Sequence, residues 1–86
     1  MNETNTPMMY KITTISTERS FTLDRRTFTT SADLCDRNRD LMTFDTIRAA
    51  EECALDYAKR NGYKYLKIGD ISTPALGETF VEIRTA

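Results

Sequence analysis

The side chains of this sequence that could do chemistry are few, and the first of them are two cysteines, Cys35 and Cys53. Their spacing excludes the C-x-x-C motif of redox proteins, and two thiols fall short of the four ligands of a structural zinc site. The chain has no histidine, so it cannot form a Ser-His-Asp triad or a Cys-His dyad. We therefore expect no enzyme activity, no metal and no cofactor. A disulfide between the two cysteines is one alternative, but we favour two reduced thiols, with Cys53 packed inside the fold.

A second candidate is the charged segment from Asp36 to Asp40, whose D-x-N-x-D pattern is that with which calcium loops begin. Such a loop also needs a glycine for its sharp turn and a glutamate as its last ligand. Leu41 and Ile47 occupy those two positions here, and arginines alternate with the acids. We therefore interpret the segment as a solvated turn.

Two further charge clusters have a similar structural interpretation. The pair Arg25-Arg26 could clamp a phosphate or a carboxylate, but we favour a solvated strand end that discourages association between sheet edges. Glu51, Glu52 and Asp56 form the acidic side of a predicted helix. Carboxylates do acid–base work when they are buried close together. No predicted cleft surrounds these three, so we expect a solvated helix face.

The strongest candidate surface comes from the segments 63–69 and 78–85, where apolar residues alternate along the chain. Side chains of a strand alternate between the two faces of a sheet. We assign to the side that packs on a helix Leu66, Ile68, Val81 and Ile83. The residues then predicted to face outward and bind a partner are Tyr63, Tyr65, Lys67, Phe80 and Arg84.

This aromatic and basic face leaves several interpretations open. It suits protein recognition, because aromatic residues and arginine dominate interface hot spots. It also suits single-stranded nucleic acid, which stacks its bases on aromatic rings. The chain has 12 basic and 13 acidic residues and a net charge of −1, which disfavours nucleic acid. The structural alternatives are a second small core and the seam of a homodimer.

The loop 70–77 lies between these two segments and could extend the same surface. It is longer than an ordinary hairpin connection. Its apolar residues Ile71 and Leu76 must either fold back onto the domain or meet a partner.

The elements that would position these residues form one domain over 8–86, after a tail at 1–7 that we expect to be disordered. The clearest element is a helix over 44–61, capped by Thr43 or Asp45 and stopped by Asn61-Gly62. Its apolar stripe is Ile47, Ala50, Cys53, Ala54, Tyr57 and Ala58. Because alanine and cysteine dominate the stripe, we expect a close approach between helix and sheet.

The remaining segments read as strands and one short helix. Strands are predicted over 8–16, 20–24 (running on through Phe28), 63–69 and 78–85, and the short helix over 32–38. In the 20–24 strand Phe21 and Leu23 share a face, and in the short helix Leu34 and Cys35 face inward. The expected fold is α+β, in the order β-β-(α)-α-β-β. A mostly antiparallel four-stranded sheet carries one long helix, and the short one, packed on one face.

The alanine-rich helix followed by Gly62-Tyr63-Lys64-Tyr65-Leu66-Lys67-Ile68 is similar to a segment of some small bacterial envelope lipoproteins. The first residues of this chain lack a basic and an apolar region, as well as the lipid-acceptor cysteine of those proteins. We therefore transfer nothing from the resemblance and expect a cytoplasmic protein without a membrane partner.

The sequence as a whole predicts a small non-enzymatic module that binds a protein of unknown identity. A regulator or inhibitor of the kind encoded by bacteria and their phages fits its size and chemistry. The alternatives are a module that binds single-stranded nucleic acid and a structural homodimer.

Overall fold

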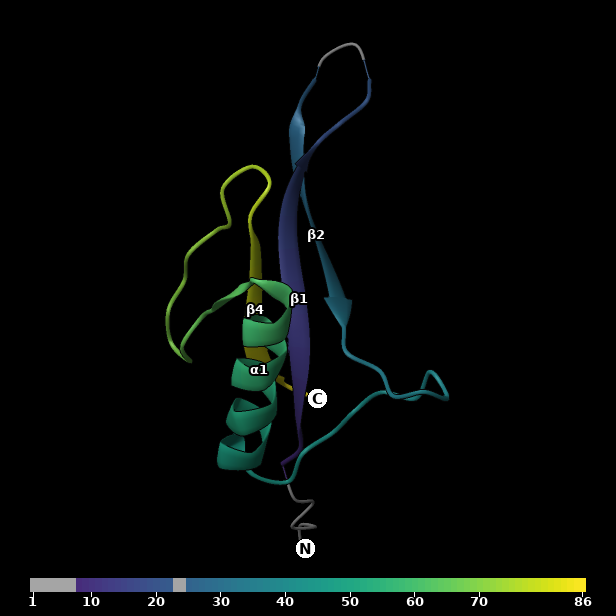
Figure 1. The fold of residues 1–86 in the computed structure, drawn as a ribbon, viewed down its shortest axis with the longest axis vertical. Coiled ribbons are helices and arrows are strands. Elements are labelled where there is room, and N and C mark those ends of the chain that lie inside the picture. Colours follow the sequence, from purple (N-terminus) through teal and green to yellow (C-terminus); the bar gives the residue numbers. More distant parts are fainter. Residues whose placement is uncertain (1–7, 23–24) are drawn as a thin grey trace, which may run out of the picture.

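The computed structural model describes residues 8–22 and 25–86 of this 86-residue chain. The predicted tail at 1–7, and Leu23 in the predicted second strand, lie outside the described residues. The elements are β1 (Tyr10–Arg19), β2 (Thr27–Asp33), α1 (Ile47–Asn61), β3 (Lys64–Tyr65) and β4 (Thr79–Thr85). They form the predicted α+β fold, a four-stranded sheet with one helix packed on it (Figure 1).

The sheet has the strand order β2-β1-β4-β3 and is mixed, so the expectation of a mostly antiparallel sheet was wrong in part. β1 lies antiparallel to β2 and to β4, while β3 runs parallel to β4. The physical reason is the long connection between β3 and β4. It carries the chain back to the end of the sheet where β3 began, and strands joined in that way run parallel.

The first hairpin differs from the prediction in its position. β1 continues to Arg19 and β2 begins only at Thr27, so the turn falls where the second strand was expected. The pairing runs from Thr13 opposite Asp33 to Arg19 opposite Thr27. β-Branched threonines fill both strands and favour extended structure throughout.

The short helix predicted over 32–38 is not found, because the backbone there continues β2 and then turns. Leu34 donates its N–H to Ile12 O at 2.8 Å, which continues the ladder with β1. Leu34 packs half-buried against the core, as expected, but Cys35 is exposed. Asp36 closes the next turn, its carboxylate accepting the N–H groups of Asn38 and Asp40 at 2.8 and 3.0 Å.

The long helix is the best predicted element. Its N-cap is Thr46, whose hydroxyl oxygen accepts the Ala49 N–H at 3.1 Å, and not Thr43 or Asp45 as predicted. Gly62 ends the helix in the left-handed region with a φ of 71°, as the sequence indicated. Within the described residues, no helix combines the length and apolar character needed to cross a membrane.

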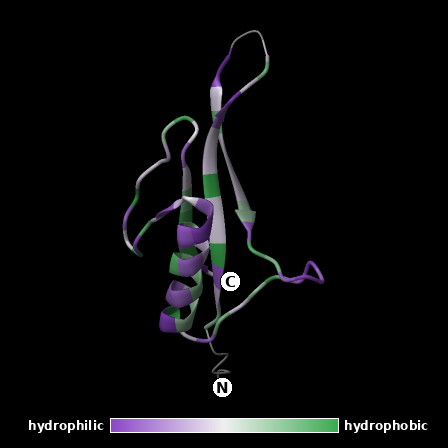
Figure 2. Ribbon diagram, viewed as in Figure 1, coloured by the Kyte–Doolittle hydropathy of each residue, from purple (hydrophilic) through white to green (hydrophobic). Residues whose placement is uncertain are grey.

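The core lies between α1 and the central strands. Its central cluster of buried residues is Ile12, Ala54, Ala58 and Val81. Figure 2 shows hydrophobic segments of β4 behind the helix and of β1 beside it, while hydrophilic and hydrophobic residues alternate along the helix. The alanine side of α1 is buried as predicted, which lets the helix backbone approach the sheet closely.

The molecule is elongated, measuring 55 × 32 × 30 Å along its principal axes. The β1–β2 hairpin accounts for much of that length, because it projects well beyond the helix (Figure 1). α1 contacts β4, β1 and β3 but not β2. The projecting hairpin and the outer edge of β2 are therefore left uncovered by the helix.

Candidate functional site

The structure separates the five residues that were predicted to form one outward face. Tyr63 and Tyr65 pack half-buried against the core on the helix side, so their predicted outward orientation was wrong. The ring of Tyr63 lies 6.0 Å from that of Tyr57 of α1, tilted by 57°. β3 pairs Tyr65 with Val81, and paired residues share a face, so Tyr65 follows Val81 toward the helix.

The phenol of Tyr65 is tied to the helix by a hydrogen bond. Its hydroxyl donates to Glu51 Oε2 at 3.2 Å. Burial, with the hydrogen bond and the charge of Glu51 added, raises the pKa of Tyr65 to about 12. Tyr65 is therefore a protonated structural ring that clamps β3 to α1.

Phe80 and Arg84 do lie on the face opposite the helix, because they alternate with Val81 and Ile83 along β4. Phe80 is only 3% exposed, and the Lys64 ammonium lies 5.5 Å from the centre of its ring. Opposite Phe80 on β1 is Ile15, which is also buried. Phe80 therefore belongs to a second small core, one of the structural alternatives considered for this face, and Lys67 lies exposed in the loop beyond β3.

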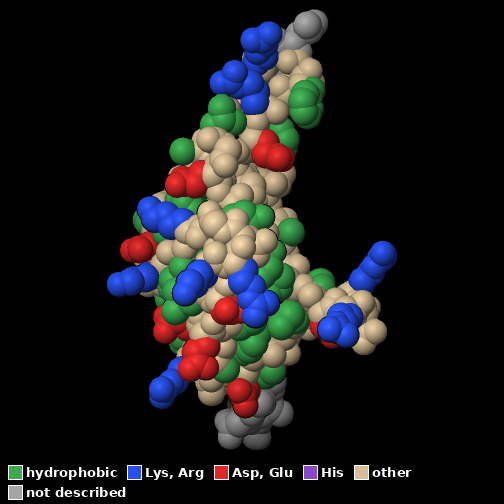
Figure 3. Space-filling model, in the orientation of Figure 1, with side chains coloured by type: hydrophobic (Ala, Val, Ile, Leu, Met, Phe, Trp, Pro, Cys, Tyr) green, Lys and Arg blue, Asp and Glu red, His purple; other side chains and the backbone are tan. Residues whose placement is uncertain are grey.

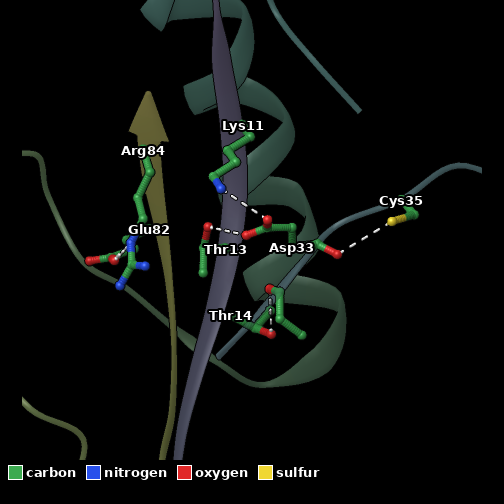
Figure 4. Close-up of polar contacts among 8 residues, drawn as sticks. Lys11, Thr13, Thr14, Asp33, Cys35, Glu82 and Arg84 are labelled. Atoms are coloured by element: carbon green, nitrogen blue, oxygen red, sulfur yellow. Dashed lines mark hydrogen bonds and ion pairs between the residues drawn. The ribbon is translucent and has the colours of Figure 1, made fainter. Parts of the chain in front are cut away.

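Beside this second core, the same face carries a polar network (Figure 4). Lys11 donates to Asp33 Oδ2 and Thr13 to Asp33 Oδ1, both at 2.9 Å. Glu82 accepts from Arg84 on the neighbouring strand β4. Each charge thus meets an opposite charge within the domain, and this part of the sheet is held together by its own side chains.

The network predicts an acid-dependent contribution to stability. The hydrogen bonds from Lys11 and Thr13 hold the pKa of Asp33 below its usual value. A carboxyl group whose pKa is lower in the folded protein than in the unfolded chain stabilises the fold at pH values above the unfolded pKa, which is about 3.9 for aspartate. That stabilisation is lost as the pH falls through the folded pKa. We expect Asp33→Asn to lower Tm by a few degrees at neutral pH, with little effect at about pH 2. Thermal melting followed by circular dichroism measures both, and an equal loss at the two pH values would contradict this.

The two cysteines are free and lie apart in the fold. Burial, with the nearby carboxylate of Asp56, raises the pKa of the Cys53 thiol, which disfavours the reactive thiolate. Cys35 is exposed, and its thiol contacts Asp33 O at 3.6 Å. Within residues 8–22 and 25–86, no cluster of histidine, cysteine or acidic side chains has an arrangement suited to a metal ion.

An open apolar site lies at the projecting end of the hairpin. A hollow of about 540 Å³ opens between the hairpin and the returning loop. Its apolar walls are Phe21, Phe28 and Leu76. The Phe21 ring is fully exposed, and the other two side chains are 43% and 48% exposed. The loop is anchored there because Gly77 donates its N–H to Thr17 O at 2.9 Å.

A second hollow adjoins the first at the hairpin tip. It measures about 320 Å³ and shares Phe21 and Arg19 with its neighbour. Arg25, which has a positive φ of 51°, lines its other side. Figure 3 shows basic and hydrophobic side chains gathered at this end of the molecule. The hairpin tip therefore places an apolar hollow directly beside a cationic one.

We call the two hollows together the hairpin-tip site, which is lined by Phe21, Phe28, Leu76, Arg19 and Arg25. The sequence analysis missed this site because it placed Phe21 within a strand. The available signal was the run of threonines on both sides of Phe21. Threonines at 13, 14 and 17, and again at 27, 29 and 30, mark two matched strands with a turn between them. Of the loop residues considered, Leu76 joins the site and Ile71 is fully exposed.

Comparisons of this chain with protein-family models, with curated proteins and with solved structures give no match.

Proposed function

We propose that this protein is a non-enzymatic protein-binding module that holds its partner at the hairpin-tip site. The observation that carries the proposal is the fully exposed ring of Phe21, which lines both hollows. A phenylalanine held wholly in water at a hairpin tip contributes nothing to the core of its own domain. Together with Phe28 and Leu76 it makes the kind of apolar patch that marks an interaction site.

The chemistry of the two hollows indicates the kind of partner. An apolar side chain fits the first hollow, where it would displace water from Phe28 and Leu76. A carboxylate fits the second, where Arg19 and Arg25 offer guanidinium groups that bind carboxylates in a fork geometry. The occupant is thus a segment of another protein in which an acidic residue neighbours an aromatic or aliphatic one.

Nucleic acid is the less supported occupant of this surface. Residues 18–26 contain three arginines but also Glu18 and Asp24, so the tip has only a small excess of positive charge. The rings once assigned to base stacking, Tyr63, Tyr65 and Phe80, are turned into the domain. A binder of phosphates needs more positive charge than this hairpin offers.

Selection of short random peptides on the immobilised protein tests the proposal. We expect enriched sequences that combine an acidic residue with an aromatic or aliphatic one. Phe21→Ala should weaken their binding about tenfold or more, because aromatic anchors dominate interface energies. Arg19→Gln should weaken only the peptides that carry the acidic residue.

Leu55→Ala is the matched control, since Leu55 is an exposed apolar residue on the helix, remote from the hairpin. It should leave peptide binding unchanged. Peptides that bind wild type and Phe21→Ala equally would remove the hairpin-tip site. Tight binding of a single-stranded oligonucleotide that falls steeply with added salt would favour the nucleic-acid alternative.

A further inference from the structure

The outer edge of β2 is a second unpartnered surface, which adjoins the hairpin-tip site at Phe28. β2 is the edge strand of the sheet, and all seven of its residues are exposed. No described element lies beside this edge. We propose that two copies of this chain pair here, β2 against β2, and join their sheets into one continuous eight-stranded sheet.

The backbone of β2 is correctly oriented for this pairing. Leu34 donates its N–H to Ile12 O, and the peptide groups of a strand alternate in direction from residue to residue. The groups of Thr27, Thr29 and Ser31 therefore point away from β1, toward the open edge. Asp33 points the same way, and its carbonyl already accepts the Cys35 thiol. The edge thus presents to solvent a row of donors and acceptors that can pair with another strand.

β2 also lacks the devices that usually prevent such pairing. Edge strands are commonly protected by lysine, by proline or by a bulge. The strand reads Thr-Phe-Thr-Thr-Ser-Ala-Asp, with no basic residue, no proline and no glycine. The sequence suggested that Arg25 and Arg26 would discourage association between sheet edges, but both come before β2 begins at Thr27 and do not interrupt its edge.

The charges at the two ends of β2 favour a second copy as the occupant. Arg25 precedes the strand and Asp36 follows it, whereas the carboxylate of Asp33 is already paired with Lys11 inside the domain. Antiparallel pairing of two identical strands places the basic start of one beside the acidic end of the other. Parallel pairing would place like charges together, which is unfavourable. The strand is therefore self-complementary in one direction only.

One register pairs the whole of β2 with itself. When Thr30 faces Thr30 of the second copy, Thr27 faces Asp33 and Thr29 faces Ser31 across the new edge. On the helix side, Phe28 then packs beside the small Ala32 of the second copy. α1 does not reach β2, so it leaves this approach open. The contact is confined to one seven-residue strand from each copy, so we expect a weak dimer whose population rises with protein concentration.

Sedimentation of the purified chain over a range of concentrations tests the pairing. We expect a monomer–dimer equilibrium in wild type and a monomer for Ser31→Pro. Proline at this position removes an N–H that faces the open edge and leaves the ladder with β1 intact. Circular dichroism verifies that the variant is folded. A wild type that stays monomeric at about millimolar protein overturns the proposal, and so does a folded Ser31→Pro that dimerises normally.

Disulfide trapping tests the register without relying on the proline variant. In the proposed pairing, the two copies of residue 30 form a non-hydrogen-bonded pair with Cα atoms about 4.5 Å apart, within the range a disulfide spans. In a Cys35→Ser background, Thr30→Cys should therefore cross-link at least about tenfold faster than Ser31→Cys, whose two copies are offset. Equal rates would overturn the register. Neither experiment involves Phe21, so the outcome is independent of the proposed peptide site.

Discussion

Replacing Ile12 with alanine is expected to lower the free energy of unfolding by about 2–5 kcal/mol, near the upper end of that range. Ile12 is fully buried between β4 and the alanine side of α1. The methyl groups of Ala54 and Ala58 are too short to fill the space that a smaller residue leaves. The cavity must therefore persist, and its cost adds to the lost burial. Urea denaturation measures the change.

Ile71→Ala is the matched control, since it removes the same atoms from a fully exposed isoleucine. It should change the free energy of unfolding by less than about 0.5 kcal/mol. Small domains have thin stability margins, and a loss of this size is enough to unfold some of them. Ile12→Val keeps the measurement usable, with an expected loss of about 0.5–1.5 kcal/mol. Equal losses for Ile12→Ala and Ile71→Ala would show that Ile12 is not a core residue.

Replacing Phe80 with alanine is the second large change, with an expected loss of about 3–5 kcal/mol. Phe80 lies on the sheet face opposite the helix and is nevertheless buried. Its ring packs with Ile15 under the Lys64 ammonium, so its removal opens a cavity in the second core. We therefore expect Phe80→Ala to lower the free energy of unfolding and not to weaken peptide binding directly. Thermal and urea denaturation of the purified variant measure it.

Phe21→Ala is the matched comparison, because it removes the same phenyl ring from a fully exposed position. It should leave stability within about 0.5 kcal/mol of wild type while it weakens peptide binding. The two phenylalanines thus separate packing from recognition. A stable Phe80→Ala that loses peptide binding would restore the sheet face as the partner surface, against the burial of that ring.

The hairpin-tip site and the β2 edge use different groups of the same projecting hairpin. Recognition at the tip depends on side chains around Phe21, whereas pairing along β2 depends on backbone groups. In the antiparallel dimer the two tips lie at opposite ends of the joined sheet. Dimerisation would therefore present two peptide sites, each with Phe21 and Leu76 open and with Ala32 of the other copy beside Phe28. Binding to a partner with two acidic segments would gain in strength.

The helix shows how far local pattern determined the structure. The spacing of Ala50, Ala54 and Ala58 predicted the buried side, and Gly62 predicted the end. Both are determined within a few residues of chain, by helical periodicity and by the freedom of glycine to adopt a positive φ. The N-cap was less certain because Thr43, Asp45 and Thr46 all carry suitable oxygens. Only the path of the preceding loop selects Thr46.

The orientation of Tyr65 shows where local pattern fails. Alternation fixes which side chains share a face within one strand, but β3 has only two residues, so Leu66 and Ile68 beyond it need not follow the pleat. The parallel pairing of Tyr65 with Val81 is determined by the long loop between their strands. The register of β3 against β4 therefore depends on this loop and cannot be predicted from the pattern of residues within either strand.

The sequence by itself determined the helix with its buried alanine side, the extended conformation of the threonine-rich segments and the α+β class. It also excluded chemistry that depends on histidine. The tertiary structure alone decided the strand order, the parallel β3, the inward turn of the tyrosines and the exposure of Phe21 at a projecting tip. The physical reason is the distance along the chain over which each interaction acts. Periodicity and capping act over a few residues, whereas strand register and burial depend on segments far apart in the chain, such as β1 and β4.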